Sequence, residues 1–145
     1  MSDAEDNRFV TLERVGKGKF EVTNVRGGKI TTGMGQDADF QPGELLLAAI
    51  ASCTGVDLDL ITSRRAELNS FNIRIDAVKM SDEHGSHLGD IHVTYDAVYP
   101  AGTDGDAARE VLPQALKRSR ERLCTVGRTV EIGTPITDEL AAPQD

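Results

Sequence analysis

The two cysteines of this chain, Cys53 and Cys124, are the residues best suited to chemistry. A cysteine thiolate is a nucleophile, and it can be oxidised reversibly to a sulfenic acid or a disulfide. The two lie too far apart in the chain to form a local Cys-x-x-Cys motif, so any shared chemistry requires the fold to bring them together. The alternative is that each is a small buried apolar residue, as free cysteines commonly are. From these residues alone, both interpretations stay open.

Cys53 lies in the most apolar stretch of the chain, which predicts a buried helix beginning at Pro42. Proline suits the first turn because it has no N–H to lose there, and Glu44 complements the positive end of the helix dipole. Every residue from 45 to 51 is apolar, so the helix belongs inside a core or between two chains. The apolar run is too short to span a bilayer, and we expect the helix to end near Leu68.

Alternating apolar and polar residues predict antiparallel strands on both sides of this helix. A second helix is expected from Thr103 or Asp104 to about Leu123, interrupted at Pro113 because proline is costly in a helix interior. The expected strands form a meander at 9–15, 19–25 and 29–32, a hairpin at 71–77 and 91–99 with a polar tip at 81–89, and a last strand at 129–132.

Length and composition predict one domain over residues 1–145, with an ordered core at about 9–136. Aromatic residues make up only 4% of the chain, which suits a protein that completes its burial by dimerising. The net charge of −8 argues against a nucleic-acid partner, because phosphate backbones attract basic surfaces. The acidic start lacks the profile of a signal peptide, which predicts a cytoplasmic protein without a membrane anchor.

Other motifs give no sign of a cofactor or a metal. No phosphate-binding loop or dinucleotide glycine pattern occurs, so we expect no organic cofactor. His84 and His87 lie near acidic residues, but they suit a solvated hairpin tip better than a metal site. The basic run at 117–122 is explained by its position at the end of the second helix, where cations complement the dipole.

Two motifs, one around each cysteine, carry a family resemblance. The first reads Pro42-x-Glu-Leu-Leu-Leu-Ala-Ala-x-Ala-Ser-Cys53-Thr-Gly-x-Asp57, and the second reads Ser119-x-Glu-x-x-Cys124-x-Val126. This pattern resembles the OsmC/Ohr superfamily of thiol-dependent hydroperoxide reductases, and most of all its OsmC-like subgroup with Asp four positions after the first cysteine. The order of predicted elements fits as well, so the resemblance spans residues 9–136.

The resemblance implies an α+β fold in which two long helices pack on curved antiparallel sheets, formed as an intertwined homodimer with active sites at the interface. It further implies that Cys53 is the peroxidatic thiol and that Cys124 resolves its sulfenic acid to a disulfide. A dithiol reductant would then restore both thiols. The expected function is reduction of organic hydroperoxides, and also of hydrogen peroxide. The alternative is a thiol sensor or small-ligand-binding protein on the same scaffold.

Attack by Cys53 requires a cation, since a free cysteine titrates near pH 8.5 and Asp57, one turn away, raises the pKa of the thiol further. In the resembling family an arginine paired with a glutamate supplies that cation. Glu44 is the candidate glutamate, although nine residues of helix place it opposite Cys53. Either the first turn is irregular, or Glu44 serves the other subunit's site, or it only caps the helix. Arg26 is the first candidate arginine, and the alternative is that it is only an exposed turn residue. The remaining candidates are Arg14, Arg64, Arg65 and Arg128.

Overall fold

The computed structural model describes residues 6–143. The chain divides into two units, residues 1–47 and 48–145, and helix α1 (Pro42–Thr62) contains the boundary between them. The second unit contains both helices and strands. Among the described residues, the sheets of both units are antiparallel. The predicted α+β class is confirmed.

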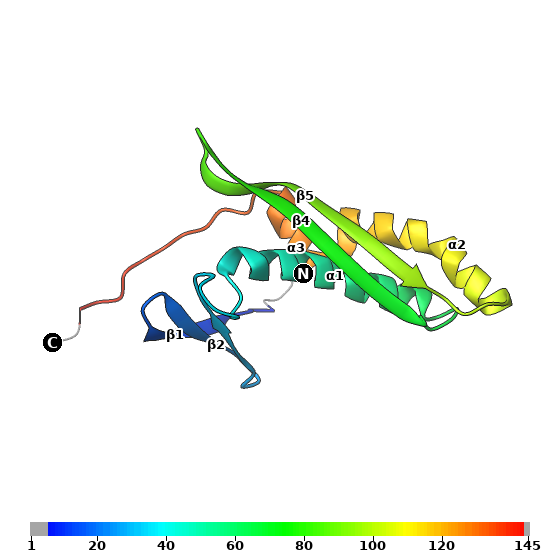
Figure 1. Ribbon diagram of the computed structural model, residues 1–145, viewed down its shortest axis with the longest axis horizontal. Coiled ribbons are helices and arrows are strands. Elements are labelled where there is room, and N and C mark those ends of the chain that lie inside the picture. The colour runs from blue at the N-terminus through cyan, green and yellow to red at the C-terminus, as the bar shows by residue number, and fades with distance from the viewer. Residues whose placement is uncertain (1–5, 144–145) are drawn as a thin grey trace. The chain divides into compact units, whose positions relative to one another are not determined.

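The first unit is a three-stranded meander formed by β1 (Val10–Gly16), β2 (Lys19–Asn24) and β3 (Lys29–Thr32), as Figure 1 shows. The predicted strands are confirmed within one residue. Asn24 fixes the second turn, because its Oδ1 accepts the backbone N–H groups of Arg26 and Gly28 at 2.9 and 3.0 Å. Arg26 therefore lies at an exposed turn of this unit.

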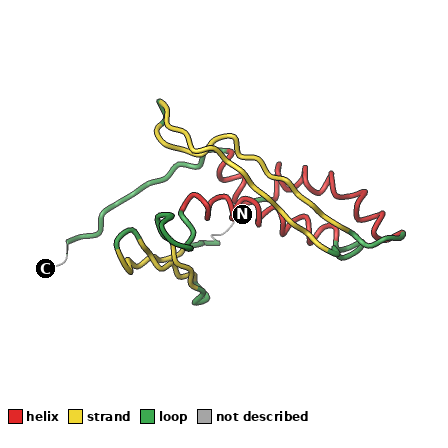
Figure 2. Tube along the Cα trace, viewed as in Figure 1, coloured by secondary structure: helices red, strands yellow, loops and turns green. Residues whose placement is uncertain are grey.

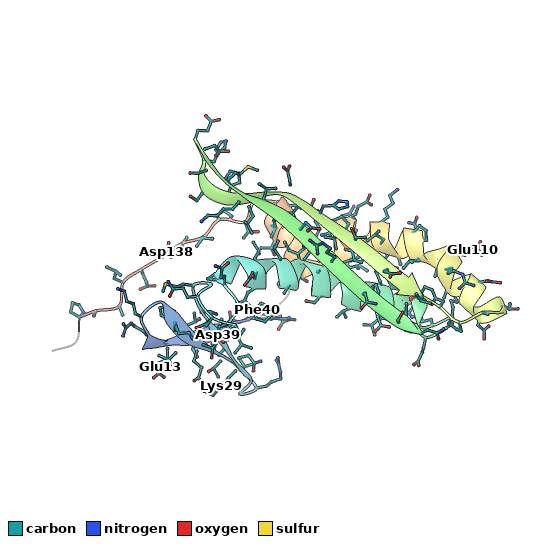
Figure 3. All side chains as sticks on the ribbon, in the orientation of Figure 1. Glu13, Lys29, Asp39, Phe40, Glu110 and Asp138 are labelled. Atoms are coloured by element: carbon teal, nitrogen blue, oxygen red, sulfur yellow. The ribbon has the colours of Figure 1, made fainter. Side chains whose placement is uncertain are left out.

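The meander has one apolar and one polar face. Leu12, Val22 and Ile30 are cross-strand partners, and Leu12 and Ile30 are 55% and 52% exposed. Because alternate residues of a strand share a face, Val10 and Phe20 belong to the same side. We call these five residues the apolar face of the meander. Glu13 and Lys29, labelled in Figure 3, belong to the opposite face.

The second unit combines the remainder of α1 with one long hairpin and a helical C-terminal part (Figures 1 and 2). Its other elements are β4 (Ser70–Asp82), β5 (Gly85–Val98), α2 (Thr103–Arg118), a π-helical turn η1 (Ser119–Leu123) and α3 (Thr125–Glu131). The best-buried apolar residues of this unit are Ile50, Ala51, Leu58, Tyr99, Ala108, Ala115 and Cys124.

The β4–β5 hairpin is longer than predicted. The expected polar tip at 81–89 is mostly strand, and only Glu83 and His84 form the turn. This tight reversal works because Asp82 Oδ1 accepts the His84 N–H at 2.9 Å and Gly85 takes a φ of 89°, which suits glycine. The polar composition of this segment therefore predicted a longer loop than the structure has.

Two predictions about helices and one about the last strand need correction. α1 ends at Thr62 rather than near Leu68, because the Thr62 carbonyl accepts the N–H groups of Arg65 and Ala66 and closes the helix. α2 continues through Pro113, and the irregularity falls at η1 instead. The predicted last strand is wrong, since residues 125–131 form α3.

α1 is apolar over more of its length than the run at 45–51 suggested. It has 21 residues, and its most apolar window has a mean hydropathy of 1.7, so by length and composition it could cross a membrane. The core helix of a soluble protein meets the same test. Here Asp57 in this helix accepts a hydrogen bond from the buried Ser119 at 2.7 Å, which ties α1 to the C-terminal helices.

Candidate functional site

The second unit brings the two cysteines together. Cys53 lies in the middle of α1 and is partly exposed, whereas Cys124 lies between η1 and α3 and is completely buried. Both are free thiols, and they lie close enough for each to shift the pKa of the other. Sequence spacing could not show this proximity, which depends on the packing of α1 against the end of the second helical segment.

The π-helical turn η1 positions Cys124. The carbonyl of Ser119 accepts the backbone N–H of Cys124 at 2.8 Å, which is the five-residue spacing of a π turn. Cys124 then takes an extended conformation before α3 begins, and its Sγ accepts the Gly127 N–H at 3.2 Å. Hydrogen bonds with backbone groups therefore fix the position of the Cys124 sulfur.

Arg120 supplies a guanidinium beside the thiol pair. Its Nη2 donates to Thr54 Oγ1 on α1 at 3.3 Å and to the Tyr95 hydroxyl on β5 at 3.4 Å. A Cβ built on Gly127 would overlap Arg120 Nη1 and would lie 3.2 Å from Cys124 Sγ. The Arg120 guanidinium and the Cys124 sulfur can both lie this close to residue 127 because glycine has no side chain.

The surroundings shift the pKa values of the two thiols in opposite directions. Burial raises the pKa of Cys53; the Val126 amide opposes this, but the Cys124 sulfur and the charge of Asp57 raise it again. Burial also acts to raise the pKa of Cys124. There, hydrogen bonds from Thr54, Gly127 and the Cys53 thiol, together with the charge of Arg120, outweigh it and the pKa is lowered. The more readily ionised thiol is the buried one.

A cavity of about 520 Å³ adjoins Arg120 and Gly127. Its walls are mostly apolar, with charged side chains at Lys117, Glu121 and Glu131. The apolar and aromatic lining residues are Ile50, Ile91, Val93, Tyr95, Pro113, Leu116 and Val130. Such a lining suits an organic molecule with a small polar group.

The other predicted site residues have structural contacts of their own. Glu44 Oε1 accepts the Gln41 N–H at 2.8 Å, so it caps α1. Arg128 pairs with Glu131 at 3.5 Å, and Arg64 and Arg65 are exposed just after α1. Arg14 is an exposed residue of β1. Among residues 6–143, no group of His, Cys, Asp and Glu side chains is arranged to hold a metal ion.

Sequence reasoning missed Arg120, because it assigned the whole basic run at 117–122 to the end of a helix. A signal was present. Arg120 lies four residues after Leu116 and four before Cys124, so it continues the inward stripe of α2 rather than its solvated side.

The sequence profile of the OsmC-like proteins matches residues 35–139, which is more than half of the chain. The chain belongs to the OsmC-like protein family. The predicted family is thereby confirmed.

Individual relatives agree with this assignment. An uncharacterised protein of Mycobacterium tuberculosis is 29% identical over 89% of this chain and 93% of its own length. A hypothetical protein from Aquifex aeolicus has a similar structure, with a TM-score of 0.72, 27% identity, and coverage of 90% and 91% of the two chains. An organic hydroperoxide resistance protein OsmC from Legionella pneumophila shares the fold, with a TM-score of 0.59, 16% identity, and coverage of 88% and 91%.

Proposed function

We propose that this OsmC-like protein is a thiol-dependent peroxidase that reduces organic hydroperoxides, and also hydrogen peroxide. The observation that carries the proposal is the pair of neighbouring free thiols, which shift each other's pKa, beside the guanidinium of Arg120. A family relative of the same fold from Legionella pneumophila is named for organic hydroperoxide resistance, which supports this choice of substrate.

The proposed reaction assigns Cys53 as the attacking thiol, because it is the more exposed of the two. Its sulfur bonds to the terminal oxygen of the hydroperoxide, the O–O bond breaks, and an alcohol leaves, so that Cys53 becomes a sulfenic acid. Cys124 then attacks that sulfur, the S–S bond forms, and the oxygen leaves as hydroxide. A dithiol reductant returns both sulfurs to the thiol state.

The cavity beside Arg120 is the proposed site for the organic part of the substrate. Its apolar wall favours a hydrocarbon chain or ring over hydrogen peroxide, which gains little from apolar contact. Because Arg120 and Gly127 line the cavity and also neighbour Cys124, a peroxide group held there would lie near the thiol pair.

A second copy of this chain is the proposed partner of the meander. The apolar face formed by Val10, Leu12, Phe20, Val22 and Ile30 needs a cover, and a cytoplasmic homodimer would provide one. In that dimer Arg26 and Glu44 are candidates to reach a thiol site as a second cation and its acidic partner, in addition to the capping contact of Glu44.

Counting free thiols tests the peroxidase directly. Pre-reduced protein is mixed with equimolar cumene hydroperoxide, and we expect two thiols per chain to be lost within seconds. Cys53→Ser should abolish this loss, whereas Cys124→Ser should leave a sulfenic acid that dimedone traps. Loss no faster than from free cysteine would contradict the proposal.

A further inference from the structure

The chain after α3 is an exposed segment with two large apolar side chains. Gly133 closes α3 with a φ of 67°, and Pro135 favours an extended conformation for the residue before it. Residues 134–143, which we call the C-terminal segment, form neither helix nor strand and run away from α3 in Figures 1 and 2. Ile136 and Leu140 are 86% and 98% exposed, more than any other large apolar side chain among the described residues.

The C-terminal segment has an apolar side with one carboxylate. In an extended chain alternate residues share a side, so Ile136, Asp138 and Leu140 lie together while Glu139 lies on the other side. Figure 3 labels Asp138. Within residues 6–143 it takes part in no ion pair. The segment therefore presents two apolar side chains with an available negative charge between them.

The apolar face of the meander carries the opposite charge, at Arg14. Arg14 is the cross-strand partner of Phe20, so it lies on the same side as Leu12 and Val22. Of the described strand residues on that side it is the only charged one, and no ion pair between described residues uses it. β1 is also an edge strand, so its outer backbone groups have no partner within the three-stranded sheet.

We propose that the C-terminal segment of a second copy adds as a strand beside β1, with Asp138 paired to Arg14. This inference rests on the homodimer of the proposed function and names the segment that covers the meander. The apolar pair of the segment spans four residues, as Val10 to Arg14 do in β1, so both patterns are about 13 Å long. A long arginine side chain reaches the residue opposite it and also the diagonal neighbour, which brings Asp138 within its range.

A second copy suits this contact because every chain carries both of its parts. In a twofold dimer each chain gives its C-terminal segment to the partner and receives the partner's segment on its own β1, so neither part is left over. The added strand pairs the backbone groups of the β1 edge and buries Ile136 and Leu140 against the apolar face. One dimer then contains two pairs of Arg14 with Asp138.

Charge reversal on either side of the contact tests the inference. Arg14→Asp and Asp138→Arg are each studied by sedimentation equilibrium, which gives the dimer dissociation constant. Each variant alone places like charges at both contacts, so we expect this constant to increase at least about tenfold. A 1:1 mixture of the two variants is also unfolded and refolded, so that the chains exchange. A mixed dimer has opposite charges at both contacts, and its dissociation constant should return to within about threefold of the wild-type value.

Two control variants change the charge by the same magnitude on sides that face away from the contact. Glu139→Arg alters the neighbouring residue of the C-terminal segment, and Glu13→Arg alters the opposite face of β1. Both should dissociate within about twofold of wild type. Wild-type protein taken through the same refolding is the reference, and far-ultraviolet circular dichroism checks that each variant is folded.

The outcomes separate this contact from the homodimer itself. If neither Arg14→Asp nor Asp138→Arg weakens a wild-type dimer, the inference is wrong and the homodimer stands. Weakening that the mixture does not relieve would also overturn the inference, because the two residues would then not meet across the dimer. A wild-type protein that sediments as a monomer at every concentration would overturn the homodimer and the inference together. Thiol counting with cumene hydroperoxide tests the peroxidase separately.

Discussion

The middle of α1 and the junction of η1 with α3 each present one sulfur to the same site, but in different ways. In α1 the backbone of Cys53 is committed to the helix, and Asp57 one turn away repels a thiolate. At the junction Cys124 is extended, and an amide, a hydroxyl and a guanidinium gather around its sulfur. The regular helix α1 leaves the Cys53 thiol accessible, whereas the interruption between η1 and α3 stabilises the anion of Cys124.

Removal of the Arg120 guanidinium should have the largest effect on the difference between Cys53 and Cys124. Arg120→Met keeps an unbranched side chain of similar length but loses the charge and the hydrogen bonds to Thr54 and Tyr95. The pKa of Cys124 should rise, and peroxide-driven thiol loss at pH 7 should slow by at least about tenfold. Stopped-flow thiol counting with cumene hydroperoxide measures the rate.

The matched control for this change is Arg122→Met. Arg122 belongs to the same basic run but is exposed, so its replacement should leave the rate within about twofold. Equal slowing by both variants would mean that general charge, and not the position of Arg120, matters.

Gly127→Ala displaces the guanidinium without deleting it. The new Cβ would overlap Arg120 Nη1, and the flexible end of that side chain can move away, so the fold should persist. Alanine also favours helix over glycine by up to about 1 kcal/mol. We expect the rate to fall by up to about tenfold while the melting temperature stays level or rises. An unchanged rate would show that the close approach of Arg120 to this backbone is dispensable.

Thr54→Val removes the hydroxyl that accepts a hydrogen bond from Arg120 and helps to lower the pKa of Cys124. The loss of one hydrogen bond of about 1 kcal/mol corresponds to about a fivefold decrease in rate. Thr54→Ser keeps the hydroxyl and should retain most of the activity. The ratio of the valine to the serine variant, measured across pH 6 to 9, isolates the hydroxyl, because both substitutions perturb the packing at this completely buried position.

The contrast between the two regions also explains what the sequence could reveal. Alternation predicted the strands, and the apolar run with Pro42 predicted α1, because both patterns are local. The four-residue spacing of Arg120 from Leu116 and Cys124 indicated an inward position, but the basic run around it suits the C-terminus of a helix equally well. Likewise, β-branched Thr129 and Val130 favour a strand, but tertiary packing and the capping contact of Cys124 select a helix.

Asp57→Asn should reduce the difference between the thiols and give the smallest effect. Its charge is one of the causes that raise the pKa of Cys53, so the neutral amide should lower that pKa and speed alkylation of Cys53 at pH 7 by about twofold. The amide oxygen can still accept the Ser119 hydroxyl, which donates at 2.7 Å, so the link between α1 and η1 persists.

Ser119→Ala is the opposite test, because it deletes that hydrogen bond and keeps the charge of Asp57. It should lower the free energy of unfolding by about 1 to 3 kcal/mol, since it leaves a carboxylate without its partner, and it should not speed Cys53. Urea denaturation and iodoacetamide labelling of both variants distinguish the two roles of Asp57. Faster labelling of Cys53 in Ser119→Ala as well would mean that the charge is not what restrains it, and that opening of the α1–η1 contact controls access to the thiol pair.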